Sequence, residues 1–360
     1  MAMTWVSSRM RGVGSALLLG LAALVTACSN GSNEPEATRS YAMGVSWFPP
    51  RPGDVALALR VADLSVPHID RALILASVPW NALLDGQSAD ALVRGNELGL
   101  ADHYRGKGLD VVVSIDPTDG FDRSRDAPAL VARGRSLAEP AVQQLYRSYV
   151  RAIDALLRPA ALGIASETNL VRQLAAPALY AGLRQAAGDA AAELRAAGST
   201  TVLFVSVQVE AAWGRPAGSY VGVATDRADF AFIAALGLSS YPHLGGYTDP
   251  GLVPGDYYSR LVAGSALPVL AIEGGWPSDA GSGVASTPEM QRRYIRRQAA
   301  LLDAARAIGW YQINFTDLDD AAWPAGVRPF ARLGLLDAAL QPKPALADWD
   351  EVRTRRLQPP

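Results

Sequence analysis

Cysteine, histidine and lysine are scarce in this chain, and their scarcity argues against disulfides, metal sites and nucleic-acid binding. Cys28 is the only cysteine among 360 residues, so an internal disulfide and a cysteine-based metal site are excluded. The three histidines, His68, His103 and His243, show no spacing typical of metal ligands. Lysine occurs only twice, and no clustered basic stripe is present. We therefore expect no metal or other cofactor and no nucleic-acid partner.

The composition is that of a folded globular chain with a large core. Hydrophobic residues make up 49% of the sequence and charged residues 19%, which is an ordinary balance for such a chain. The length suits one α/β barrel domain as well as two smaller domains. No Gly-x-Gly-x-x-Gly motif follows the first expected strand, which disfavours a dinucleotide-binding open sheet.

The N-terminal segment has the pattern of a signal peptide. Arg9 and Arg11 precede an apolar stretch from Ala16 to Val25. This stretch of about 10 residues is shorter than the roughly 20 that a membrane-spanning helix needs, so it is typical of a secretory signal. Its end, Leu24-Val-Thr-Ala-Cys28, resembles the bacterial lipobox, in which the cysteine is lipidated and becomes the mature N-terminus.

We therefore expect residues 1–27 to be a lipoprotein signal peptide and residues 28–40 a flexible tether. The segment after Cys28 is polar and has no apolar period, which is typical of a disordered linker. The expected location is the bacterial cell envelope, outside the cytoplasm, with the membrane contacted through a lipid on Cys28. An ordinary secretory signal with a chance cysteine and an uncut membrane anchor are the alternatives.

From residue 41 onward, short apolar runs alternate with segments of helical period. Right-handed βα units that repeat eight times roll up into a closed barrel, so residues 41–355 are predicted to form a single (β/α)8 (TIM) barrel. A doubly wound open sheet is the competing architecture. The expected strands are 41–47, 71–78, 109–115, 161–165, 201–207, 232–239, a run that ends at Glu273, and 310–315. The expected helices are 54–64, 88–104, 137–157, 177–197, 255–262, 288–308 and 343–355.

The active site of such a barrel lies at the C-terminal ends of its strands. Two of these ends carry glutamates: Val269 to Ile272 lead to Glu273, and Leu162 to Ser166 lead to Glu167. A carboxylate pair suits glycosidic bond cleavage, because one group protonates the leaving oxygen while the other attacks the anomeric carbon. Amides and aromatic rings, which bind sugars, gather at the same ends. The expected substrate contacts are Trp47, Trp80, Asn81, Asp116, Asn169, Tyr241, His243, Trp276, Asn314 and Trp323.

Several short motifs resemble those of clan A glycoside hydrolases. Ile272-Glu-Gly-Gly-Trp-Pro-Ser278 is similar to the Glu-Thr-Gly-Trp-Pro-Ser nucleophile segment of some of these families. Ser240-Tyr-Pro-His243 resembles their strand-six tyrosine segment. Gly334-Leu-Leu-Asp337 and Pro342-Lys-Pro-Ala345 resemble the closing stretch of endo-galactanase-like and glucanase-like members. In outline the resemblance runs from residue 41 to residue 349.

The resemblance implies a role for each matched position. Glu273 would be the nucleophile and Glu167 the acid/base, with Tyr241 beside the nucleophile and Trp323 as a sugar platform. The family has asparagine before the acid/base, where it binds the sugar 2-hydroxyl, whereas this chain has Ser166. Serine is shorter and offers one hydroxyl, so either the contact with the 2-hydroxyl is weaker or Asn169 or Asn81 replaces it.

The sequence thus predicts a monomeric, retaining glycoside hydrolase that acts on a β-linked polysaccharide or oligosaccharide. In the free enzyme this mechanism requires Glu167 to be protonated and Glu273 to be ionised. The alternative is a surface lipoprotein that binds carbohydrate on the same barrel without cutting it, and Ser166 motivates this alternative. The aspartate-rich segment 116–126 lacks calcium-loop spacing and is expected to be an exposed loop.

Overall fold

The computed structural model describes residues 37–358. The predicted signal peptide, Cys28 and most of the predicted tether lie outside this range. Within it, no helix combines the length and the apolar character needed to cross a membrane.

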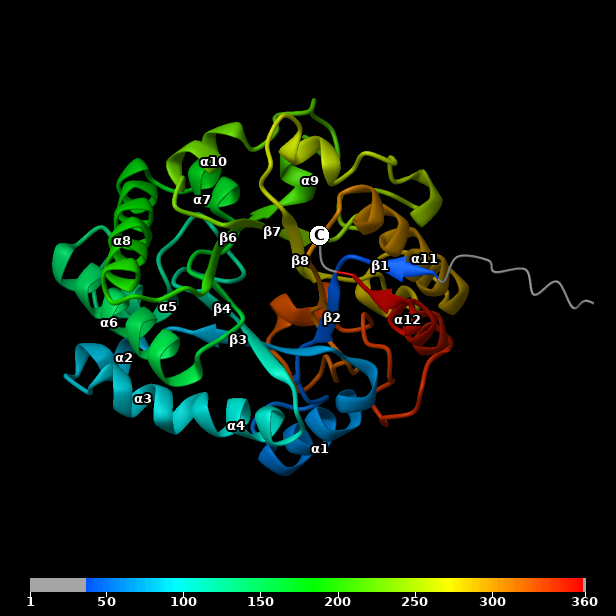
Figure 1. Ribbon diagram of the computed structural model, residues 1–360, viewed down its shortest axis with the longest axis horizontal. Helices are drawn as coiled ribbons and strands as arrows, with labels where there is room; N and C mark the ends of the chain where they lie inside the picture. The colour runs from blue at the N-terminus through cyan, green and yellow to red at the C-terminus, as the bar shows by residue number, and fades with distance from the viewer. Residues whose placement is uncertain (1–36, 359–360) are drawn as a thin grey trace, which may run out of the picture. The chain divides into compact units, whose positions relative to one another are not determined.

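Eight parallel strands form the barrel (Figure 1). They are hydrogen-bonded in the order β2-β9-β8-β7-β6-β5-β4-β3, and a parallel bridge between Ser46 and Leu73 joins the two edges. The predicted (β/α)8 barrel is thereby confirmed. The strands are β2 (Ala42–Val45), β3 (Arg71–Ser77), β4 (Asp110–Asp116), β5 (Ala161–Gly163), β6 (Val202–Gln208), β7 (Ala235–Ser240), β8 (Val269–Gly274) and β9 (Gly309–Gln312).

Helices surround the strands on the outside of the barrel (Figure 1). The longer ones are α1 (Val55–Ser65), α3 (Ala89–Asn96), α4 (Leu98–Gly106), α6 (Pro140–Leu157), α8 (Pro177–Ala196), α11 (Pro288–Ala304) and α12 (Pro344–Thr354). The shorter ones are α2 (Trp80–Leu84), α5 (Pro128–Ala132), α7 (Thr168–Leu174), α9 (Val209–Ala212) and α10 (Ala224–Asp229). Single 3-10 turns are η1 (Val66–His68), η2 (Pro250–Leu252), η3 (Ser259–Val262), η4 (Ala280–Ser282) and η5 (Ala325–Phe330).

Two helix predictions differ from the structure. The single helix expected over 88–104 is divided into α3 and α4 at Glu97, whose backbone leaves the ideal helical geometry. The Glu97 side chain is buried, and its carboxylate accepts a 2.8 Å hydrogen bond from the Tyr149 hydroxyl. The helix expected over 255–262 is reduced to the 3-10 turn η3.

Large aromatic side chains close the barrel interior below the strand ends. Phe204 and Tyr311 are fully buried there among aliphatic residues from the neighbouring strands. Glycines make room for them: a Cβ on Gly163 would lie 2.4 Å from the Phe204 ring, and a Cβ on Gly44 would lie 2.6 Å from Tyr311. The interior is therefore a packed floor, and open space begins only at the C-terminal ends of the strands.

The ends of the described chain meet beside the barrel. β1 (Thr38–Arg39) pairs in parallel with β10 (Arg356–Leu357). The buried Arg39 guanidinium forms a two-pronged ion pair with Asp70, at 2.7 and 3.0 Å. This ion pair holds the start of the barrel chain against the segment that leads into β3.

Replacing Phe204 by alanine should lower the free energy of unfolding by about 3–5 kcal/mol, because the facing glycines cannot fill the vacated space. Chemical denaturation measures this loss. Phe121→Ala is the matched control: its ring is 62% exposed, so we expect a change below about 0.5 kcal/mol. Equal losses in the two variants would contradict the packed floor.

Candidate active site

The two strand-end glutamates face one space at the top of the barrel. Glu273 lies near the end of β8, and Glu167 follows β5 at the start of α7. Glu167 has a left-handed backbone conformation, with φ of 46°, which is uncommon for a residue other than glycine. Its N–H donates a 2.9 Å hydrogen bond to Ser206 Oγ on β6. The turn thus directs this carboxylate inward instead of along the outside of the sheet.

A single serine hydroxyl joins the two carboxylates. Ser239 Oγ, on β7, lies 2.8 Å from Glu167 Oε1 and 3.3 Å from Glu273 Oε2. These two oxygens are therefore at most about 6 Å apart, close to the spacing of a retaining glycosidase and below that of most inverting ones. The Tyr241 hydroxyl also donates to Glu273 Oε2, at 3.3 Å.

Arg123 is the cation of this site, and it contacts Glu167 instead of Glu273. Its Nε donates to Glu167 Oε2 at 2.8 Å, and its Nη1 donates to Asp116 Oδ2 at 2.6 Å. Only 6% of its side chain is exposed. Burial lowers the pKa of the guanidinium, but the charges of Asp116 and Glu167 outweigh burial and raise it overall. Arg123 is therefore a permanent buried charge beside Glu167.

The pKa of Glu273 is raised. Burial first, and then the charge of Glu167, raise the pKa of Glu273 to about 7, although Arg123 and the Tyr241 hydroxyl act in the opposite direction. The pKa of Tyr241 is also raised, by burial and by the charge of Glu273, so the phenol stays neutral and can donate. The expected state of the free protein, with Glu167 protonated and Glu273 ionised, stays a prediction.

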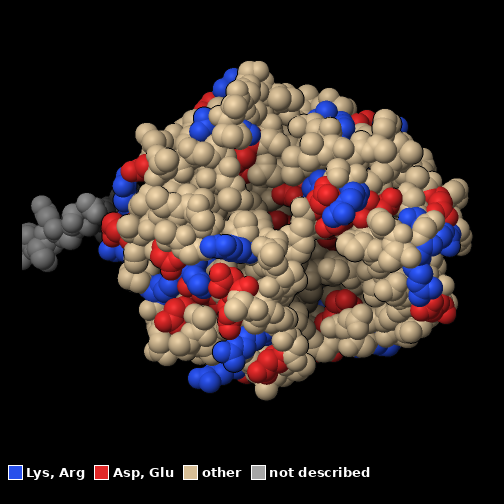
Figure 2. Space-filling view, turned by 180° about the vertical axis from the view of Figure 1, so that it is seen from behind, with Lys and Arg blue, Asp and Glu red and all other residues tan. Residues whose placement is uncertain are grey.

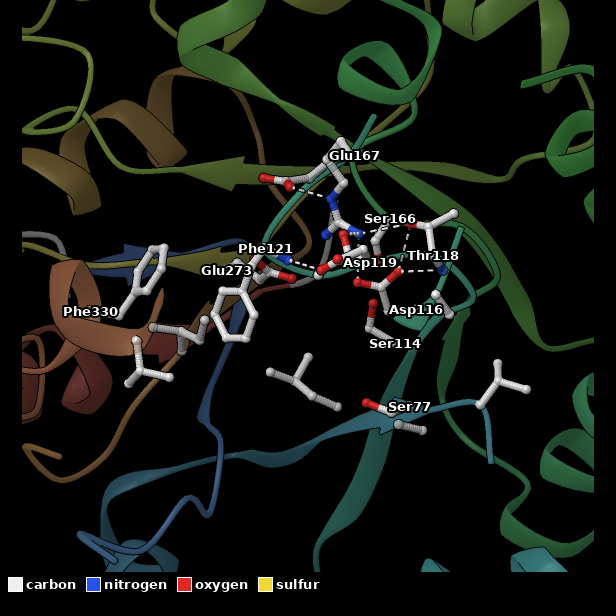
Figure 3. Close-up of a pocket in the computed structure, with 18 of the residues that line it drawn as sticks. Ser77, Ser114, Asp116, Thr118, Asp119, Phe121, Ser166, Glu167, Glu273 and Phe330 are labelled. Carbon is white, nitrogen blue, oxygen red and sulfur yellow. Dashed lines mark hydrogen bonds and ion pairs between the residues drawn. The ribbon is translucent and has the colours of Figure 1, made fainter. Parts of the chain in front are cut away.

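A cavity of about 540 Å³ opens above the two glutamates. Figure 2 shows the face opposite to that of Figure 1, hollowed near its centre, with acidic atoms visible inside the hollow. Figure 3 shows Asp116, Thr118 and Asp119 grouped beside Glu167, with the rings of Phe121 and Phe330 on the Glu273 side. Of the predicted site residues, the cavity is lined by Trp80, Asp116, Glu167, Tyr241, Glu273, Asn314 and Trp323.

Five other expected substrate contacts lie outside the lining of this cavity. The Asn169 side chain bonds the backbone at Gln208 through both amide atoms, each at 2.8 Å. Trp276 is fully buried, and its indole N–H donates to Ser286 Oγ at 3.0 Å. Both side chains are thus committed to holding loops in place. Asn169 therefore does not replace the asparagine that Ser166 displaces.

The remaining three expected substrate contacts, His243, Asn81 and Trp47, also lie outside the cavity lining. His243 is buried between Tyr241 and Trp276, with ring centroids 6.2 and 5.7 Å away. Burial lowers its pKa to about 4, and neither ring nitrogen finds a hydrogen-bond partner among the described residues. Asn81 is exposed on α2, and Trp47 is half-buried against the Phe48 ring, 6.1 Å away.

Sequence reasoning missed Arg123, because segment 116–126 was expected to be an exposed loop. That expectation is wrong for its centre: Asp119 and Arg123 are 5% and 6% exposed. Asp119 accepts from the Phe121 N–H and pairs with Arg125, which folds the segment back on itself. The available signal was an arginine placed among aspartates directly after a strand.

Ser239 and four aromatic or apolar wall residues were also missed. Ser239 precedes Tyr241 by two positions, so both side chains lie on the same side of the chain. Phe48 and Trp323 pack edge to face, 6.0 Å apart, and the Trp323 indole N–H donates to Pro50 O. Further wall residues are Phe121, Val327 and Phe330.

Glu210, on α9, is a further buried carboxylate near the strand ends. Hydrogen bonds from Tyr257 at 2.9 Å and Ser240 at 3.0 Å reach its Oε1, and burial raises its pKa to about 7. Glu210 contacts β7 through Ser240 and is not part of the cavity lining. Across residues 37–358, no group of three or more potential ligands among histidine, cysteine, aspartate and glutamate could hold a metal ion.

Comparisons with known proteins match the fold. No family model matches the sequence, and no curated protein matches it. The structure resembles an exo-β-1,4-mannosidase from Opitutaceae bacterium strain TAV5, with TM-score 0.65 and 18% identity over 89% of this chain and 61% of that chain. It also resembles GH5_18 from Streptomyces cattleya, solved in complex with GlcNAc, with TM-score 0.63 and 20% identity over 90% of this chain and 83% of that chain.

A β-glucuronidase from Ruminococcus gnavus, solved with D-glucuronic acid, is a more distant match. Its TM-score is 0.53, and the identity is 12% over 88% of this chain and 49% of that chain. The chain therefore spans about three fifths of the mannosidase and half of the glucuronidase. At these identities the likeness establishes the (β/α)8 fold that glycoside hydrolases also use.

Glu273→Gln should raise the free energy of unfolding above pH 7, because it removes a carboxylate that is costly to ionise when buried. The folded-state pKa of about 7 exceeds the ordinary 4.5, so the contribution of this one carboxyl group to stability is most favourable below pH 4.5 and is lost as pH rises from 4.5 to 7. The gain should reach at most about 3 kcal/mol at pH 8 and vanish near pH 4.

Denaturant titration across this pH range measures the effect. Glu351→Gln, at an exposed position on α12, is the control and should show no such pH dependence. A gain that does not depend on pH, or a loss at pH 8, would contradict a buried, costly carboxylate at position 273.

Proposed function

We propose that the protein is a retaining glycoside hydrolase that acts on a β-linked oligosaccharide or polysaccharide. The observation that carries the proposal is the pair of strand-end glutamates that share the Ser239 hydroxyl at 2.8 and 3.3 Å. This arrangement limits the separation of the two oxygens to about 6 Å, a spacing that suits direct attack on the anomeric carbon. An inverting mechanism needs a wider gap for a water molecule.

In the proposed reaction, Glu273 attacks the anomeric carbon while Glu167 protonates the departing oxygen. Tyr241 donates to Glu273 Oε2 and stabilises its charge before attack. Once Glu273 is bonded to the sugar, Glu167 removes a proton from water, which displaces the enzyme and restores both carboxyl groups. Arg123 favours this second step, because it stabilises the ionised base.

The cavity walls suit a carbohydrate ring. The aromatic residues Trp80, Trp323, Phe48, Phe121 and Phe330 line the same cavity as the carboxylates, and aromatic surfaces pack on the C–H faces of sugars. Three carboxylates beyond the acid/base line the same space, with Arg123 as the one cation of the described lining. The known activities of the similar structures, a mannosidase and a glucuronidase, support a glycosidase in general terms.

We propose further that the protein is a lipid-anchored monomer of the bacterial cell envelope, attached through Cys28. The support is the sequence Leu24-Val-Thr-Ala-Cys28 behind a basic and apolar leader. The polar tether would then hold the barrel at the membrane surface, where it can reach external glycans.

Glu273→Gln and Glu167→Gln should each lower kcat at least about 1,000-fold, because each removes a group that acts directly on the sugar. Purified protein that starts after Cys28, assayed on a panel of 4-nitrophenyl β-glycosides and β-glycan oligosaccharides, provides the measurement. Glu351→Gln is the control and should match wild type. Proton NMR of the first product should show the β-anomer, and an initial α-anomer would contradict retention.

The second candidate function is carbohydrate binding without cleavage. It is favoured by the Arg123–Glu167 ion pair, which opposes protonation of the expected acid. In that case wild type would turn over none of the panel, and oligosaccharide binding would be unchanged in Glu273→Gln. Turnover that disappears in Glu273→Gln would exclude it.

Cys28→Ser should release the protein from the membrane. Bacteria that express the full chain and are fed radiolabelled palmitate should label wild type and leave Cys28→Ser unlabelled, with the variant in the soluble envelope fraction. Ser29→Ala is the matched control and should label as wild type does. Equal labelling of all three would contradict acylation at position 28.

A further inference from the structure

A register shift places Ser239 between the two glutamates. β7 and β8 pair regularly up to Leu238 and Ala271, and the next pair is Ser239 with Glu273, so Ile272 is an extra residue on β8. Without this bulge the pairing of Ser239 with Glu273 would be lost. Ser239 is fully buried, so its hydroxyl is shielded from bulk solvent.

The hydroxyl has one proton to donate and two lone pairs that can accept. It lies within hydrogen-bond reach of Glu167 Oε1 and Glu273 Oε2, at 2.8 and 3.3 Å. Two ionised carboxylates cannot both receive its one proton. Both contacts are satisfied when one glutamate is protonated and donates to Ser239 Oγ, while Ser239 donates to the other. The three oxygens then form a continuous hydrogen-bonded chain.

The shared proton can lie on Glu167 or on Glu273, and the surrounding charges favour one of these two positions in the free protein. Arg123, with Asp116 behind it, contacts Glu167 from the β4 side. Tyr241 contacts Glu273 from the end of β7, and Tyr294 on α11 lies near Tyr241. Because the cation faces Glu167, the proton belongs on Glu273 before substrate binds. The proposed reaction needs the opposite arrangement.

We propose that Ser239 is a proton relay that moves the shared proton from Glu273 to Glu167. Glu273 gives its proton to Ser239 Oγ, and in the same event Ser239 gives its own proton to Glu167 Oε1. In each of the two transfers one O–H bond breaks and one forms. The serine ends with the same number of protons, and no other reactant is required. Glu273 is then an ionised nucleophile and Glu167 a protonated acid. The catalytic role of this proton transfer rests on the proposed hydrolase function.

Neighbouring serines provide a matched pair of variants. Ser240 is equally buried, but its hydroxyl lies 3.0 Å from Glu210 Oε1, on the other side of β7. Ser239→Ala breaks the chain, Ser239→Thr keeps a hydroxyl there, and Ser240→Ala removes a hydroxyl next to it. Ser239→Ala should lower kcat about 100-fold with little change in KM, and the other two should stay within a few-fold of wild type.

Carboxyl NMR of protein labelled with ¹³C-glutamate gives a second readout that needs no substrate. In wild type and Ser239→Thr the signals of Glu167 and Glu273 should respond to one another's titration, and in Ser239→Ala this coupling should weaken and the titration midpoint of Glu273 should shift. Unchanged titration in Ser239→Ala would overturn the relay. So would an equal loss of kcat in Ser239→Ala and Ser239→Thr with folding intact.

The two readouts also separate this inference from the proposed function. If wild type cleaves no glycoside on the panel, the proposed hydrolase is wrong, while the NMR titration still decides whether Ser239 couples the carboxyls. If wild type cleaves a glycoside and Ser239→Ala cleaves it equally well, the relay is wrong and the hydrolase stands.

Discussion

The repulsion between two closely spaced carboxylates at the top of the barrel is the constraint on which the rest of the site depends. Glu167 is buried and Glu273 is partly buried, and they lie close enough to share one hydroxyl at the base of the cavity. Both can be ionised only if positive charge or hydrogen-bond donors offset the repulsion. The structure supplies Arg123 to one carboxylate and hydroxyl groups to the other. In the proposed two-step displacement, this pair holds one proton.

The barrel makes this costly arrangement possible. Its interior is filled by Phe204 and Tyr311 against glycines, so the strand ends stand on a rigid floor. The left-handed turn at Glu167 and the bulge beside Ile272 are local irregularities on that regular frame. Irregular backbone of this kind persists where the surrounding structure fixes it, and it is concentrated at functional sites. Both irregularities direct a side chain toward the shared hydroxyl.

Much of the fold could be predicted from the sequence, because the eight apolar runs and the helical segments between them are strongly periodic. Glu167 and Glu273 could be predicted for the same reason, since each directly follows such a run. Arg123 and Ser239 could not. Arg123 reaches Glu167 across 44 positions of the chain, and Ser239 reaches Glu273 only through a register shift. Neither relation has a local pattern in the sequence.

Trp276, His243 and Asn169 show the opposite error. Each follows a strand and has a side chain that could bind sugar, yet each supports a loop or packs in the core. Position after a strand brings a residue to the correct end of the barrel, but tertiary contacts decide whether its side chain turns toward the cavity. Phe48 and Phe121 reach the cavity from loops, and Phe330 from the end of η5; their positions depend on contacts such as that of Phe121 with Gly326.

The central claim is that Glu273 forms a covalent bond to the sugar. Incubation with 2-deoxy-2-fluoro β-glycosyl fluorides of the sugars that wild type cleaves should trap that bond, because the fluorine slows its hydrolysis. Intact-mass spectrometry should then show one added fluoroglycosyl group, and peptide mapping should place it on Glu273. A label on Glu167, or no label on a protein that cleaves the parent glycoside, would contradict the account.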